Sequence, residues 1–202
     1  MARARALCGL LLAASAVSRP AQPMLTYVTL WKDQMKPWGL DPDANPDALS
    51  AWLDQARGAG VSHVMISASW ADVEPKEGAF DLAPLLRLIG KIGQKGLLSM
   101  VVLDAFRGPQ WLFERHPDAR PLGGGPPEHP CNKRIRGFTT FAHTEAFAYA
   151  LRFVSTTVQE INSALGPSAV HSFQPNFNNE LEARYTQECD IFLDYSPTTI
   201  AA

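Results

Sequence analysis

The sequence predicts an α/β domain with a parallel sheet, in the form of the first half of a TIM (β/α)8 barrel with about four βα units. Apolar segments of strand length alternate with segments of helical periodicity from residue 25 to residue 177. No Gly-x-Gly-x-x-Gly loop follows the first or the second strand, and polar and aromatic residues gather after the strand ends instead. These observations favour a barrel over a doubly wound open sheet.

The first unit and the strand that follows it are expected between residues 25 and 69. Thr and Val alternate with larger apolar side chains at 25–31, which predicts a strand. Asn45 and Pro46 then begin a helix, because Pro fits the first helical position. This helix runs to about Arg57, where two nearby glycines end it. Residues 61–69 form the second strand.

The third strand follows a second amphipathic helix. Asp81 is expected to cap that helix, whose apolar stripe consists of Leu82, Leu85, Leu86, Leu88, Ile89 and Ile92. Residues 97–103 are an almost unbroken apolar run, which suits a parallel strand covered on both faces. A short helix is expected at 109–116, and residues 121–136 form an irregular loop rich in Gly and Pro.

The longest helix precedes the fourth strand. Its predicted apolar face consists of Ala142, Ala146, Tyr149, Ala150, Phe153, Val154, Val158, Ile161 and Leu165. Gly166 and Pro167 end it, and residues 169–177 form the strand. The resulting order βαβαβαβ implies a parallel sheet with right-handed crossovers.

The N-terminus has the pattern of a targeting segment. A short basic stretch precedes an apolar, uncharged run from Ala6 to Val17, with a small-x-small cleavage pattern at 14–16. This pattern predicts a signal peptide at 1–16, a partial barrel domain at 17–202 and a secreted or lumenal protein, with an organelle transit peptide as the alternative. The run is shorter than the roughly 20 apolar residues of a membrane span, so no membrane partner is expected.

Composition excludes several other partners. The net charge is −2 and 46% of the residues are hydrophobic, as in an ordinary soluble protein, so nucleic acid is not an indicated partner. The basic cluster at 133–136 is interpreted as a solvated loop. No cofactor is expected, and scattered histidines make no metal-ligand pattern. Cys131 and Cys189 could form a disulfide in an oxidising compartment or remain free thiols.

Carboxylates follow two of the predicted strands. Glu180 comes after the fourth strand, directly behind Asn179, and Asp104 ends the third. In a (β/α)8 barrel the carboxyl ends of the strands hold the catalytic groups, and a carboxylic acid there suits general-acid cleavage of a glycosidic bond. Such chemistry needs a second carboxylate, and no comparable site follows Glu180 in the sequence.

Three motifs carry a resemblance to a known family. Residues 70–81 have the pattern Trp-x-x-x-Glu-Pro-x-x-Gly-x-Phe-Asp after the second strand. Residues 108–112 contain Pro-x-Trp-Leu after the third strand and precede His-Pro-Asp at 116–118. An Asn-Glu pair at 179–180 follows the fourth strand. In this order and spacing, residues 25–195 resemble clan A glycoside hydrolases, especially the family-42 β-galactosidases. An Arg on the second strand, expected for sugar contact, has no obvious counterpart.

The resemblance implies a retaining O-glycosyl hydrolase of the β-galactosidase type, with a carbohydrate as substrate. Glu180 is then the acid/base, because a partly closed cleft raises a carboxyl pKa; a solvated loop glutamate is the alternative. Asn179 is expected to contact a sugar hydroxyl, or to be a turn residue.

The remaining candidate residues have more than one interpretation. Trp70 and Trp111 could stack on pyranose faces as substrate-binding residues, or pack in the core under the loops. Asp104 could bind substrate, help to hold Glu180, or cap structure. Glu74 is interpreted as a hydrogen-bond acceptor that fixes its loop rather than as a catalytic group.

The family's nucleophile belongs to a later strand than those found here, so the sequence predicts a truncated form. Whether it is an enzyme stays open at this point. The alternatives are a non-catalytic carbohydrate-binding half-barrel and an inverting β-amylase-like glycosidase, which is similar around residues 64–80. Unpaired outer strands also predict self-association through the open sheet edges.

Overall fold

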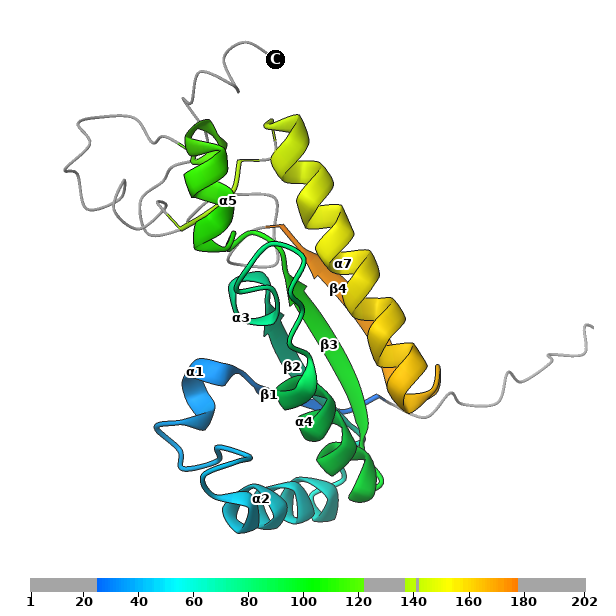
Figure 1. Cartoon of the computed structure of the whole chain (residues 1–202). Coiled ribbons are helices and arrows are strands. Elements are labelled where there is room, and N and C mark those ends of the chain that lie inside the picture. The colour runs from blue at the N-terminus through cyan, green and yellow to red at the C-terminus, as the bar shows by residue number, and fades with distance from the viewer. Residues whose placement is uncertain (1–24, 122–136, 141, 178–202) are drawn as a thin grey trace, which may run out of the picture.

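The computed structural model describes residues 25–121, 137–140 and 142–177, which form a four-stranded parallel sheet in the order β1-β2-β3-β4 with helices between the strands (Figure 1). The elements are β1 (Tyr27–Leu30), α1 (Lys32–Met35), α2 (Pro46–Gly58), β2 (His63–Ser69), α3 (Trp70–Val73), α4 (Ala83–Gln94), β3 (Leu98–Asp104), α5 (Gln110–Arg115), η1 (Pro117–Ala119), α7 (Thr144–Leu165) and β4 (Val170–Asn176). The predicted parallel α/β sheet is confirmed, and each predicted strand overlaps an observed one.

Strand register divides the side chains between two faces of the sheet. Val64, Ile66 and Ala68 of β2 are buried under the helices, together with Val101 and Leu103 of β3; we call this side the helix face. The alternate residues point to the opposite side, the open face. There, Ser67, Val102 and Gln174 form one row across the strands, and Ser69, Asp104 and Asn176 form the next. The open face is therefore polar at the carboxyl ends of the strands.

Helices α4 and α7 lie side by side over the helix face (Figure 1). The buried residues of α4 are Leu85, Leu88, Ile89 and Ile92, all from the predicted stripe. The predicted cap is wrong by one residue, because Leu82 occupies the N-cap position without a side-chain bond. The Asp81 backbone N–H donates to Val73 O (2.7 Å), and its carboxylate accepts from Ala83 N (3.2 Å) in an Asx-type turn.

The long helix α7 buries a narrower stripe than its sequence predicts, consisting of Ala146, Ala150, Phe153, Thr157 and Ile161. Thr157 was absent from the predicted stripe, and Leu165 is exposed at the helix end. Gly166 ends the helix with a φ of 84°, which favours glycine. None of the helices in the described part of the chain is both long and apolar enough to cross a membrane.

Candidate active site

A cleft of about 820 Å³ opens on the open face at the carboxyl ends of the strands. Strand ends β2, β3 and β4 contribute Ser67, Ser69, Val102, Asp104 and Asn176, and the segment after β1 contributes Trp31, Lys32, Asp33, Lys36 and Pro37. Asp72, Phe106 and Arg107 complete the lining. At the rim, Lys32 Nζ lies 2.8 Å from Asp72 Oδ2, which ties α1 to α3. The cleft combines hydroxyl, amide, carboxylate and aromatic groups.

Asp104 is the predicted site residue that the structure places in this cleft. Asn176 Nδ2 donates to its Oδ1 at 2.9 Å, so the ends of β3 and β4 are joined by a side-chain hydrogen bond. Burial raises the pKa of the Asp104 carboxyl, although the bond from Asn176 and the charge of Arg107 oppose the shift. Asp104 is therefore a partly desolvated carboxyl facing a polar cleft, and it caps no helix.

We expect the Asp104→Asn variant to melt at a higher temperature than the wild type at pH 7. Because the folded-state pKa is raised, the ionised carboxyl disfavours folding, and its protonated form stabilises the fold only as the pH falls. The amide oxygen of Asn can still accept from Asn176. Melting curves from pH 7 downward should converge below the ordinary Asp value of 3.8. A variant less stable than the wild type at pH 7 would contradict this assignment.

Trp70 lies on the other side of the sheet from the cleft. It comes two residues after Ala68, so its side chain points to the same side of the sheet, and it is 0% exposed. Its ring stacks on that of Phe153 of α7, with 5.8 Å between the ring centres. Its Nε1 donates to Glu74 Oε2 at 2.8 Å. The expectation that Trp70 stacks on a sugar does not fit this position, because the helix face holds the hydrophobic core. The alternative interpretation, packing in the core, fits Trp70.

Trp111 also faces the helices, as part of α5. Its Nε1 donates to the backbone oxygen of Glu74 (3.0 Å), and its ring meets Trp70 and Tyr149 edge to face. The guanidinium of Arg152 lies 5.9 Å from the ring centre. Trp111 is half-buried and does not line the cleft. The packing alternative therefore fits Trp111 as well.

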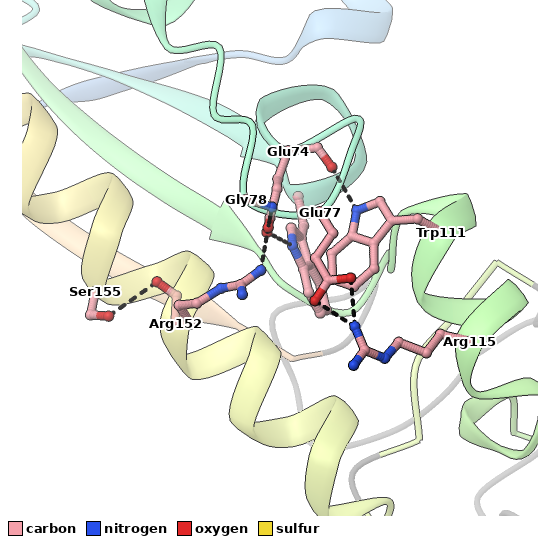
Figure 2. A network of polar contacts seen from close by, with 8 residues as sticks. Glu74, Glu77, Gly78, Trp111, Arg115, Arg152 and Ser155 are labelled. Atoms are coloured by element: carbon pink, nitrogen blue, oxygen red, sulfur yellow. Dashed lines mark hydrogen bonds and ion pairs between the residues drawn. The ribbon is translucent and has the colours of Figure 1, made fainter.

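Glu74 has the loop-fixing role that its sequence context predicts. Its carboxylate, 0% exposed, accepts from Trp70 Nε1, from Gly78 N at 2.7 Å and from Arg152 of α7. Figure 2 shows this carboxylate between Gly78 and Arg152, and beside it the more exposed pair of Glu77 and Arg115. The segment that follows β2 is thus fastened to α7 on the helix face, and Asp72 of α3, in the same segment, lines the cleft.

Three potential metal ligands meet at the start of α7, although their sequence spacing shows no pattern. One ligand atom each of His116, Asp118 and His143 lies within 4.8 Å of the others. However, His143 Nδ1 accepts from Ala146 N at 3.1 Å and caps the helix, so its Nε2 carries the proton and faces Asp118 Oδ1 at 3.3 Å. A protonated nitrogen cannot bind a metal. His143 therefore serves as the N-cap of α7.

The remaining sequence-predicted site residues, Asn179, Glu180, Cys131 and Cys189, lie outside the described residues. Conversely, Trp31, Asn176 and Arg107 line the cleft and were not singled out from the sequence. Asn176 could have been found, because it continues the alternate polar positions Ser172 and Gln174 of β4, which point to the same face.

The fold is that of barrel glycosidases. The structure superimposes on the crystal structure of β-galactosidase from the psychrophilic Marinomonas ef1 with a TM-score of 0.60 and 21% identity, covering 88% of this chain and 24% of that one. The expected partial barrel is thereby confirmed.

Within that class the family is identified by sequence. Residues 43–188 match the family model of glycoside hydrolase family 42, described as β-galactosidase, so the chain belongs to this family. β-Galactosidase BbgII of Bifidobacterium bifidum is 37% identical over 82 residues, and BgaH of Haloferax lucentense is 32% identical over 69 residues. These stretches cover 38% and 34% of this chain but only 12% and 10% of those proteins. The resemblance drawn from the three motifs is confirmed.

Proposed function

We propose that the protein is a retaining glycoside hydrolase that acts on β-galactosides, and that the cleft on the open face binds the sugar. The observation that carries this proposal is the cleft itself, which lies at the carboxyl ends of the strands of a family-42 chain. Barrel enzymes hold their catalytic groups at that end. The partly desolvated Asp104 and its partner Asn176 offer hydroxyl-binding groups there.

Trp31 takes the aromatic role that the sequence suggested for Trp70 and Trp111. It follows β1 directly and lines the cleft, where its indole offers apolar surface to the C–H face of a pyranose. Asp104, Asn176 and Ser69 form a polar row across the strand ends. We propose that this row binds sugar hydroxyls while Trp31 packs against the ring.

Glu180 is proposed as the acid/base and Asn179 as a contact to a sugar hydroxyl. The support is their sequence position, four and three residues after Asn176, the last residue of β4. Four residues of extended chain span at most roughly 14 Å, which keeps Glu180 within reach of the cleft. The acid protonates the leaving oxygen while a second carboxylate attacks the anomeric carbon.

Hydrolysis by the full-length protein tests the proposal. Release of galactose from an aryl β-galactoside is expected, with the β-anomer as the first product, since two successive displacements through a covalent glycosyl-enzyme intermediate retain the anomeric configuration. An aryl α-galactoside and an aryl β-glucoside serve as matched controls. Turnover of β-glucosides without β-galactosides would contradict the substrate, and first release of the α-anomer would contradict the retaining mechanism. Galactose binding without any turnover would support the non-catalytic alternative.

Two further proposals concern processing and assembly. We propose that residues 1–16 are removed as a signal peptide and that the protein is secreted, which sequencing of the mature N-terminus tests.

We also propose that the chain self-associates through the outer strands β1 and β4 of the described sheet. Sedimentation of the purified chain tests the second proposal, and a stable monomer would contradict it.

A further inference from the structure

Two histidines meet on the open face at the opposite end of the sheet from the cleft. His63 begins β2 and His171 is the second residue of β4. Their ring centres are 4.4 Å apart, with an angle of 77° between the ring planes. His63 is 7% exposed, whereas His171 is exposed to solvent. One imidazole is therefore built into the fold and the other covers it from the solvent side.

A β-bulge brings the two rings together across β3. Ser99 of β3 pairs with Val170 and the next residue, Met100, pairs with Ser172, so His171 is an extra residue on β4. A bulge re-aims the side chain of the extra residue. His63, Ser67 and Ser69 occupy alternate positions of β2, so the side chain of His63 also points to the open face.

Hydrogen bonds fix the tautomer of His63. Ser62 Oγ lies 2.8 Å from Thr26 O, an atom that can only accept, so the single hydroxyl proton is donated there. With the hydroxyl proton donated to Thr26 O, the contact of 2.7 Å between Ser62 Oγ and His63 Nδ1 is an N–H donation from the imidazole. His63 Nε2 consequently carries a lone pair. That atom is buried and has no hydrogen-bond partner among the described residues.

We propose that His63 Nε2 and a ring nitrogen of His171 form a two-histidine site for a transition-metal ion of the Zn²⁺ class. Metal–nitrogen bonds of about 2.0–2.1 Å place the centres of two imidazoles on one ion roughly 4.5 to 5 Å apart at common bond angles, close to the observed separation. The Nδ1–H bond to Ser62 is the kind of outer contact that holds a metal-binding imidazole in the required tautomer.

The positions of the two rings also suit a metal ion, because His63 is buried in the fold and His171 borders the solvent. A neutral imidazole is the form that binds a metal. The exposed side of His171 leaves room for water molecules in the remaining coordination positions.

Calorimetric titration of the purified chain with ZnCl₂ tests the site. One high-affinity ion per chain is expected. His171→Ala should weaken binding about tenfold or more, since loss of an outer contact alone typically costs 10- to 100-fold. His171 is exposed, so this variant should fold, which its melting curve without zinc checks. The matched control is His116→Ala in the cluster with Asp118 and His143, which should bind zinc as the wild type does.

Three results would overturn the proposal. The first is a chain that binds no zinc in the micromolar range. The second is His171→Ala with wild-type affinity, which would assign binding to another group, such as a cysteine. The third is loss of binding in His116→Ala but not in His171→Ala, which would assign the ion to His116, Asp118 and His143.

Discussion

Glu180→Gln in the full-length protein should lower kcat/KM for β-galactosides with poor leaving groups by about 10²- to 10⁴-fold, the usual contribution of general acid catalysis. An alkoxide leaving group needs a proton in the transition state, and Gln cannot supply one. Aryl galactosides with acidic phenols leave without that help, so their glycosylation step should lose much less. This difference between substrates distinguishes a lost acid from a distorted site.

The measurement is a comparison of lactose with a nitrophenyl galactoside in wild type and variant. Glu188→Gln, a matched substitution in the same segment, should keep both rates near those of the wild type. Equal losses on the two substrates would argue against an acid role for Glu180. Unchanged rates on both would remove Glu180 from the mechanism.

Glu74→Ala should lower the free energy of unfolding by about 3 kcal/mol, because it removes a fully buried carboxylate that accepts three hydrogen bonds. The substitution leaves the Trp70 indole N–H and the Gly78 backbone N–H without their acceptor, and it opens space behind the loop. Arg152 is 37% exposed and can turn to solvent, and Gly78 is exposed, so most of the cost falls on the buried Trp70 indole N–H and on the space left by the side chain.

Glu77→Ala is the matched control, since Glu77 is only three residues from Glu74 in the sequence and also pairs with an arginine. The pair of Glu77 and Arg115 is 38% and 54% exposed, and such surface pairs contribute about 0–1 kcal/mol. Urea unfolding of both variants measures the difference. Equal destabilisation by the two substitutions would contradict the role of Glu74 as the fastening point of the loop.

Sequence periodicity was sufficient for the four strands and the longer helices, whereas the short helices α1 and α3 were not predicted. The apolar run at 97–103 and the stripe of α4 each depend on local spacing, which the chain itself displays. The alternation of β2 also explains the position of Trp70, because Ile66, Ala68 and Trp70 are alternate residues whose side chains point to the same side of the sheet. The expectation that Trp70 stacks on a sugar was based on the residue type and did not take this alternation into account.

Contacts between distant segments were beyond local patterns. The bond from Asn176 to Asp104 joins residues 72 positions apart, and it depends on the register between β3 and β4. His116 and His143 come together only when α5 and η1 pack beside the start of α7. The bulge that turns His171 towards His63 has no marker in the sequence. In a regular strand the side chains of neighbouring residues point to opposite faces of the sheet, so alternation alone would not place His171 on the same face as the next residue.

The central claim is that the sugar binds in the cleft on the open face and not beside the tryptophans of the helix face. Titration of the chain with galactose, followed by the indole N–H signals in NMR spectra, tests it most directly. Trp31→Phe identifies the signal of Trp31. Our account predicts a saturable shift of that signal, while Trp70 and Trp111, whose N–H groups bond to Glu74, remain unchanged. Shifts of Trp70 or Trp111 with a silent Trp31 would contradict it.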